Sequence, residues 1–165
     1  MFQINDYVVY GSTGICQIVD VCRMQFAGVA GREYFILEAV YGNRMRVYVP
    51  TDCEDAMRHM MTRDELLTLI RSMPDIDDEW ITEDPLRRTS FQRVLRGGDQ
   101  IQMIRVIKMI SKRRIELEKK GKRLTVSDAD SLKEAEKMLH NEFAFILQIE
   151  PDEVVPFILN ENQLV

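Results

Sequence analysis

A block of cationic side chains is the most chemically suggestive feature of this 165-residue sequence. Residues 86–123 carry thirteen Lys and Arg against three Asp and Glu, whereas the whole chain has a formal net charge of −5. Guanidinium and ammonium groups bind phosphate, and proteins hold nucleic acids largely through such contacts. The block therefore predicts a surface for a localised anionic partner, and it supplies the candidate DNA contacts if that partner is DNA. Its candidate residues are Arg87, Arg88, Arg96, Lys112, Arg113, Arg114, Lys119, Lys120, Lys122 and Arg123.

The spacing of these cations limits the prediction. Arg87, Arg88, Arg93 and Arg96 cannot all share one face of a helix, and Arg93 is the first that we would assign to an exterior salt bridge. Cations near a helix C-terminus also interact favourably with the helix dipole, so part of the cluster is equally consistent with a structural role. No recognition helix or arm is evident. We therefore expect non-specific contact with the phosphate backbone.

The remaining reactive residues form no catalytic or metal-binding pattern. The three cysteines, Cys16, Cys22 and Cys53, contain no Cys-x-x-Cys pair, and neither His59 nor His140 has metal-ligand spacing from a cysteine. The sequence also lacks the phosphate-binding, zinc-protease and serine-hydrolase motifs. We therefore expect a protein with no enzymatic activity, no cofactor and no metal.

A second candidate site is a short strand with polar residues on one side. Arg46 and Tyr48 alternate with Val47 and Val49, as in a half-buried antiparallel strand, and Pro50 ends the segment. An exposed strand edge can bind another protein because its N–H and C=O groups are unpaired. We predict that this strand docks on a protein partner, with Arg46 and Tyr48 pointing outward. The candidate contact residues are Arg23, Met24, Met45, Arg46, Val47 and Tyr48.

The two halves of the chain have different patterns of apolar residues, which predict strands in the first half and helices in the second. Residues 1–61 contain four short segments rich in β-branched and aromatic residues, separated by glycine turns, with a fifth strand expected near residues 57–60. This pattern predicts a small antiparallel β-barrel. Over residues 62–165 the apolar period changes to 3.6, which predicts an all-α bundle of four to five helices. The expected fold class is therefore α+β, with two domains.

Several boundaries in the helical half follow from capping residues. Thr62 and Glu65 have the spacing of a capping box, and Asp99 follows two glycines at the expected start of a long helix. Ser127 is expected to open the next helix. The acidic residues 74–85 carry prolines at both ends and predict a loop.

Composition bounds the class of protein. Hydrophobic residues make up 45% of the chain, which is enough for a packed core. No apolar run approaches the ~18–20 residues that span a bilayer, and the N-terminus lacks the basic and long apolar regions of a secretory signal. We therefore expect a cytoplasmic protein with no membrane partner and no small-molecule substrate.

A series of short motifs runs through both halves of the chain. They are Asp6-Tyr7-Val8-Val9-Tyr10 with Gly14-Ile15, Tyr34-Phe35-Ile36-Leu37, Val47-Tyr48-Val49-Pro50, Trp80-Ile81, Arg87, Phe91, Leu95, Gly98-Asp99, Lys137-Met138-Leu139 and Glu142-Phe143-Ala144. No single motif is specific, but their order resembles that of the CarD/CdnL family of bacterial transcription regulators. The resemblance spans residues 2 to about 149.

This resemblance implies a Tudor- or SH3-like N-terminal barrel, shared with transcription-repair coupling factors, that binds the β subunit of RNA polymerase. It also implies a helical domain that contacts promoter DNA at the upstream edge of the transcription bubble and modulates open-complex stability. In well-studied members a tryptophan wedges into the minor groove there. At the corresponding position this chain has Asp84, and Trp80 lies four residues earlier. Trp80 is therefore either a DNA wedge or a hydrophobic anchor of the helical domain.

Two other interpretations stay open. A stand-alone, non-specific nucleic-acid-binding protein would need exposed aromatics in a basic groove of the barrel, yet residues 1–52 carry four cations and five anions. A purely structural dimer subunit would use the acidic C-terminal segment that ends in residues 157–159 as an association surface, whereas the same segment folded back onto the bundle would not. Tight duplex binding without a protein partner would favour the first of these.

Overall fold

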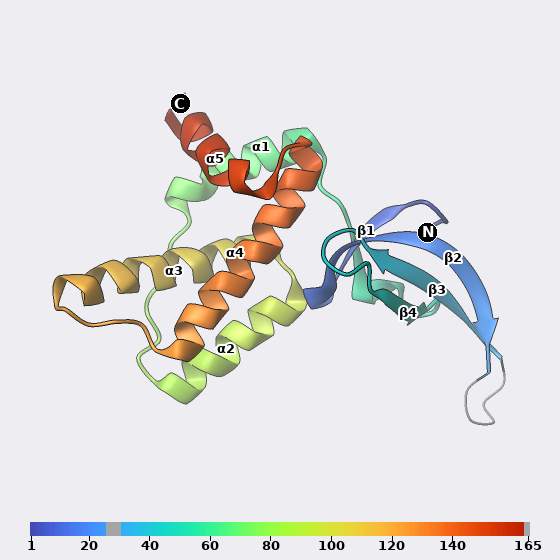
Figure 1. The fold of residues 1–165 in the computed structure, drawn as a ribbon, viewed down its shortest axis with the longest axis horizontal. Helices are drawn as coiled ribbons and strands as arrows, with labels where there is room; N and C mark the ends of the chain where they lie inside the picture. The colour runs from blue at the N-terminus through green and yellow to red at the C-terminus, as the bar shows by residue number, and fades with distance from the viewer. Residues whose placement is uncertain (26–30, 164–165) are drawn as a thin grey trace. The chain divides into compact units, whose positions relative to one another are not determined.

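The computed structural model describes residues 1–25 and 31–163, which divide into two compact units, Met1–Met60 and Met61–Val165 (Figure 1). The first unit is built on a β-sheet and the second on helices, so the predicted α+β fold class is confirmed. Among the helices of the described residues, none is long and apolar enough to cross a membrane.

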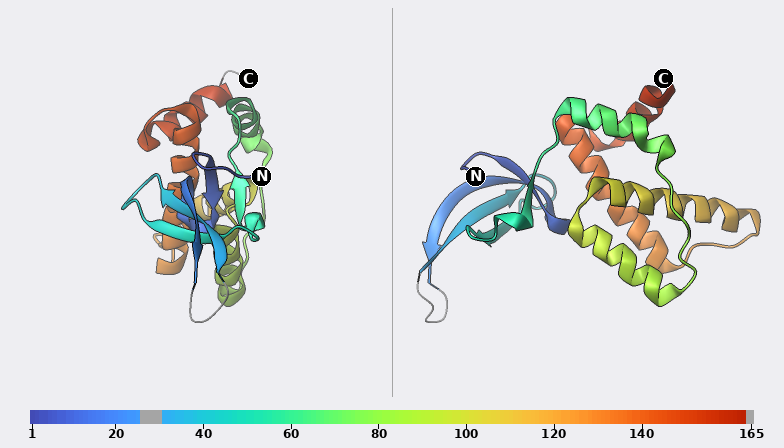
Figure 2. Two further views of the ribbon diagram at one scale, coloured as in Figure 1. Left: turned by 90° about the vertical axis from the view of Figure 1, so that its right-hand side faces the viewer. Right: turned by 180° about the vertical axis from the view of Figure 1, so that it is seen from behind.

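The N-terminal unit is a curved, five-stranded antiparallel sheet (Figure 2). The strands are β1 (Tyr7–Tyr10), β2 (Gly14–Met24), β3 (Arg32–Ala39), β4 (Arg46–Pro50) and β5 (Met57–His59). They are ordered β4-β3-β2-β1-β5, so β4 and β5 form the edges of the described sheet. Alternate residues, including Val8, Ile18 and Leu37, are buried together in one core.

Strand β4 shows the alternation expected from its sequence. Arg46 and Tyr48 are exposed, Val49 is buried and Val47 is half-buried. The prediction that Arg46 and Tyr48 point outward is therefore confirmed. The strand was expected from residue 44, but its pairing with β3 begins at Arg46, and Arg44 has a left-handed φ of 51° that does not fit a strand.

The helical unit surrounds its longest helix. Its elements are α1 (Arg63–Ser72), the 3-10 turn η3 (Met73–Asp75), α2 (Asp84–Gly97), α3 (Gln100–Lys119), α4 (Val126–Leu147), the 3-10 turn η4 (Pro151–Glu153) and α5 (Val154–Gln163). Helix α4 packs against each of the other four helices. The predicted bundle of four to five helices is thus confirmed, with five helices.

Side-chain caps fix where the helices start. The Thr62–Glu65 capping box is present, and Asp99 accepts a hydrogen bond from the N–H of Gln102 at the start of α3, as predicted. The prediction that Ser127 opens α4 is wrong. Thr125 is extended and its Oγ1 accepts from the N–H of Asp128 at 3.1 Å, so α4 starts two residues earlier.

The helical unit has two hydrophobic cores. The larger one gathers α1, α3, α4 and α5 around residues such as Leu66, Ile104 and Phe143. The smaller one lies where α2, α3 and α4 meet, around Phe91 and Ile110. Trp80, in the segment that joins η3 to α2, packs against the smaller core.

Candidate functional site

The outer edge of β4 carries no strand partner in the described sheet, because β4 pairs only with β3. Met45 and Tyr48 beside this edge expose 54% and 44% of their surface. Arg46 lies between them, with its Nε 3.4 Å from Glu38 Oε2 on β3. Val47 packs partly against the sheet core. The edge thus presents an aromatic ring, a thioether and a guanidinium next to an open strand, a combination that suits a protein partner.

The strand register separates Arg23 and Met24 from this group. Arg23 pairs with Glu33, whereas Arg46 pairs with Glu38, five residues further along β3. At about 3.3 Å per residue, the two arginines are offset by about 16 Å along the strands, and β3 lies between them. We therefore leave Arg23 and Met24 out of the β4-edge site, which we define as Met45, Arg46, Val47 and Tyr48.

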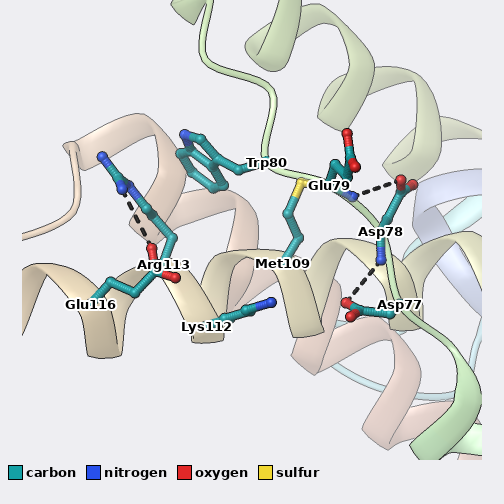
Figure 3. A pocket seen from close by; sticks show the side chains of 8 residues that line it. All are labelled: Asp77, Asp78, Glu79, Trp80, Met109, Lys112, Arg113 and Glu116. Atoms are coloured by element: carbon teal, nitrogen blue, oxygen red, sulfur yellow. Dashed lines mark hydrogen bonds and ion pairs between the residues drawn. The ribbon is translucent and has the colours of Figure 1, made fainter.

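Two guanidinium groups lie within cation–π distance of the Trp80 ring, and Figure 3 shows one of them, that of Arg113. The Cζ atoms of Arg87 and Arg113 lie 4.5 Å and 5.6 Å from the centre of its ring, and the ring meets Phe91 edge-on at a centroid distance of 6.3 Å. Such contacts stabilise a half-buried indole through cation–π and aromatic interactions. The arrangement is that of an anchor that holds the segment before α2 on the smaller core.

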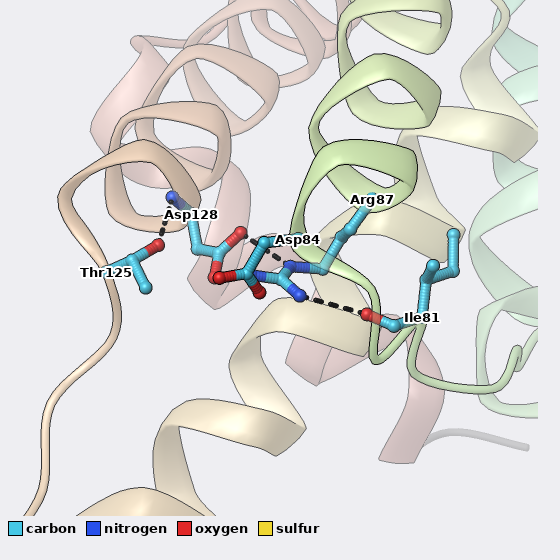
Figure 4. A network of polar contacts seen from close by, with 5 residues as sticks. All are labelled: Ile81, Asp84, Arg87, Thr125 and Asp128. Atoms are coloured by element: carbon cyan, nitrogen blue, oxygen red, sulfur yellow. Dashed lines mark hydrogen bonds and ion pairs between the residues drawn. The ribbon is translucent and has the colours of Figure 1, made fainter.

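Arg87 differs from the predicted phosphate contact because it is only 4% exposed. Its Nε and Nη2 donate to the two oxygens of Asp128 on α4, both at 2.9 Å, and its Nη1 donates to the carbonyl of Ile81 at 3.0 Å (Figure 4). A further ion pair joins it to Asp84 at 2.7 Å. The hydrogen bond to Asp128 raises the pKa of Arg87 above its ordinary value.

This burial removes Arg87 from the predicted DNA surface, because its donors are already paired inside the protein. The network instead joins α2, α4 and the segment before α2. Sequence reasoning missed Asp128 as the partner. The two residues are 41 positions apart, and no local spacing connects them.

Most of the other predicted DNA contacts are exposed and, among the described residues, form no ion pair. The same holds for Arg93, so the exterior salt bridge expected there is not observed. Arg113 is half-buried, and its Nη1 lies 3.4 Å from Glu116 Oε2. Among the described residues, the exposed candidates that form no ion pair are Arg88, Arg96, Lys112, Arg114, Lys119, Lys120, Lys122 and Arg123.

Several of these cations gather where α3 ends and α4 begins. Arg114, Lys122, Arg123 and Lys133 line a hollow of about 630 Å³, together with two carboxylates. Lys119 and Lys120 close α3 immediately before this hollow and are exposed. We call residues Arg114, Lys119, Lys120, Lys122 and Arg123 the cationic tip. Its excess of unpaired positive charge is suited to binding phosphate.

Lys108 is a further cation whose role the sequence did not reveal. Its Nζ donates to the main-chain carbonyls of Met73 at 2.8 Å, Pro74 at 3.3 Å and Ile76. These bonds fix the start of the acidic segment to α3. No sequence pattern around Lys108 indicates that its ammonium group binds the carbonyls of η3.

The comparison with known families concerns the sheet unit. Residues 2–61 match the family model described as the CarD-like/TRCF RID domain. The match covers 60 of the 165 residues, and we call this stretch the RID domain. Domains of this kind engage RNA polymerase, and the match supports a transcription-related protein that interacts with RNA polymerase. No curated protein matches the chain.

The RID domain contains the whole five-stranded sheet, including the open edge of β4. It therefore agrees with the resemblance stated from the N-terminal motifs. A domain of this kind mediates protein interaction and is not catalytic, which is consistent with a non-enzymatic protein. The helical unit and its cationic tip lie outside the matched residues.

Proposed function

We propose that this protein binds the β subunit of RNA polymerase through the β4 edge of its RID domain and contacts promoter DNA non-specifically through its helical unit, thereby modulating open-complex stability. The observation that carries the proposal is the RID domain with an unpaired edge strand whose Arg46 and Tyr48 point outward. In this proposal, residues 1–61 form the docking domain and residues 62–165 form the DNA-contacting domain.

Strand addition explains why the edge of β4 is suited to docking. Another strand can continue the sheet through main-chain hydrogen bonds, which provide affinity, while the side chains on the two faces provide selectivity. Arg46 and Tyr48 belong to the types enriched at interface hot spots. Val47 contributes by holding the strand on the sheet core rather than by direct contact.

The cationic tip supports the DNA half of the proposal. Three to five phosphate contacts would give a salt slope of about −3 to −5, which corresponds to weak, non-specific binding. Docking on the polymerase would raise the local concentration of the tip near DNA, and a tethered contact gains about 10²–10⁴-fold over a free one. Weak phosphate contacts are therefore sufficient for a factor that reaches DNA on the polymerase.

The docking test uses two substitutions in the full chain and one matched control. We expect Arg46→Ala/Tyr48→Ala to weaken capture of the isolated polymerase β subunit at least about tenfold, the effect of losing a hot-spot contact. Arg23→Ala removes an exposed arginine of the same sheet outside the β4-edge site and is expected to leave capture unchanged. Equal capture by all three proteins would refute docking through β4.

A further inference from the structure

An acidic segment crosses the helical unit between η3 and α2. We call residues 76–83 the acidic strap, because they contain four carboxylates and no cation. The strap belongs to neither flanking helix and has no regular secondary structure. Its position depends on side chains of the same basic block that supplies the predicted DNA contacts.

Both ends of the strap are held by cations. At its start, Lys108 of α3 donates to the carbonyl of Ile76 and to those of the preceding turn. Near its end, Arg87 donates to the carbonyl of Ile81, and the guanidinium groups of Arg87 and Arg113 both contact the Trp80 ring. Three of the thirteen cations in residues 86–123 thus hold the strap and are not free to bind phosphate.

The middle of the strap lies beside α3. Asp77, Asp78 and Glu79 line a hollow of about 640 Å³ together with Lys112 and Arg113 of α3 (Figure 3). Within residues 1–25 and 31–163, Asp77 and Asp78 each accept a hydrogen bond only from the next backbone N–H, at 2.9 Å and 2.8 Å. Among the described residues, none of the three forms an ion pair with Lys112.

The charge balance of this hollow is unfavourable for DNA. Its lining includes four carboxylates, the fourth from Glu116, against two cations. A phosphate that approached Lys112 would enter the hollow that the three strap carboxylates also line. Unpaired carboxylates beside a cation lower its attraction for an anion without needing to contact it.

We propose that the acidic strap is an autoinhibitory cover that lowers the affinity of α3 for DNA by opposing phosphate at Lys112. This inference rests on the proposed DNA contact of the helical unit. The strap weakens the part of that contact that Lys112 would make and so keeps free-duplex binding weak. Docked on polymerase, the protein then reaches DNA mainly through the tether.

The direct test neutralises the strap without shortening it. The variant Asp77→Asn/Asp78→Asn/Glu79→Gln keeps side-chain oxygens that can accept the same backbone N–H groups. Because charges within one Debye length of about 10 Å interact appreciably at 0.1 M salt, we expect duplex DNA to bind about 3- to 10-fold more tightly. We also expect the salt slope to steepen by about 1, since one further phosphate is contacted at Lys112.

The matched control changes the net charge by the same amount elsewhere on the helical unit. Asp64→Asn/Glu134→Gln/Asp152→Asn alters three exposed carboxylates on α1, α4 and η4. Binding of a fluorescent duplex by the full chain, followed by anisotropy, compares the variants. We expect the gain of the strap variant to exceed that of the control at least about threefold, because screening weakens distant charges.

A second substitution identifies the cation that the strap covers. Adding Lys112→Gln to the strap variant should remove most of its gain, whereas adding Lys137→Gln on α4 should not. If strap and control variants bind DNA equally, or if the gain survives Lys112→Gln, the autoinhibitory role is excluded while the proposed function stands. If the wild-type chain and all variants fail to bind duplex even at low ionic strength, the DNA half of the proposed function is lost as well.

Discussion

At the scale of single residues, the first question is whether Trp80 is a DNA wedge or a hydrophobic anchor of the helical unit. Its ring packs on Phe91 and contacts two guanidinium groups, so Trp80→Ala opens a void beside the smaller core. We expect the substitution to lower the free energy of unfolding by about 2–4 kcal/mol, somewhat below a fully buried aromatic. Urea unfolding followed by far-UV circular dichroism measures this change.

The DNA role of Trp80 is tested with the same Trp80→Ala variant. The measurement is the lifetime of polymerase–promoter open complexes at a temperature where the variant is fully folded. An anchor predicts that the lifetime is close to that obtained with the wild-type chain. A shortened lifetime combined with unchanged stability would contradict the anchor and support a wedge.

The buried ion pair between Arg87 and Asp128 gives a second prediction, about the stability of the helical unit. Replacing Arg87 by Met leaves a buried, unpaired carboxylate, because Asp128 is only 4% exposed. We expect a loss of about 3–5 kcal/mol in the free energy of unfolding. The double variant Arg87→Met/Asp128→Leu should recover much of this loss, since no buried charge remains. A double variant no more stable than Arg87→Met would contradict this account.

His140 links stability to pH. Burial lowers the pKa of His140 below its ordinary value, while the neighbouring Glu136 opposes the shift. As the pH falls, His140 takes up a proton in the unfolded chain before it does so in the folded chain. The contribution of neutral His140 to stability is therefore complete above the unfolded pKa of about 6.5 and is lost as pH falls through the folded pKa. We expect His140→Gln to flatten the decline in melting temperature measured between about pH 7 and pH 5. An identical decline in both proteins would exclude His140 as its source.

At the scale of elements, the start of α4 provides a paired test of capping. Thr125 accepts the bond from the N–H of Asp128, whereas Ser127 lies within the first turn. We expect Thr125→Ala to lower the free energy of unfolding by about 1 kcal/mol, within a range of about 0.5–2. Ser127→Ala should change it by less than half as much in the same urea titration. The reverse order would mean that Ser127 is the cap after all.

These elements show which parts of the structure a sequence can predict. The Thr62–Glu65 box, the Asp99 cap and the alternation in β4 depend on residues within a few positions, and all three were predictable. Thr125 and Ser127 both fit an N-cap, so spacing alone could not choose between them.

The candidate sites depended on contacts over longer distances. Whether Arg87 is a phosphate contact or an interior ion pair depends on Asp128, and the position of Arg23 depends on strand register. Likewise, nothing local shows that Lys108 binds the carbonyls of η3. Composition located the basic block, but only tertiary structure separated its interior cations from its exposed ones.

At the scale of the whole molecule, the proposal joins two weak contacts into one effective interaction. The RID domain supplies attachment to polymerase, and the cationic tip supplies phosphate contacts whose affinity alone is low. Since an intramolecular contact gains about 10²–10⁴-fold, either contact should lose its effect on promoters when the other is removed.

This dependence is testable with variants of each contact. Arg46→Ala/Tyr48→Ala should bind free duplex as the wild-type chain does, yet lose the effect on open-complex lifetime because it no longer docks. Lys119→Gln/Lys120→Gln/Lys122→Gln/Arg123→Gln should still bind polymerase, with the salt slope for free duplex shallower by about 2–4 and the same loss of effect on lifetime. A docking variant that kept its full effect on open complexes would show that the helical unit acts without the tether, as a stand-alone nucleic-acid-binding protein would.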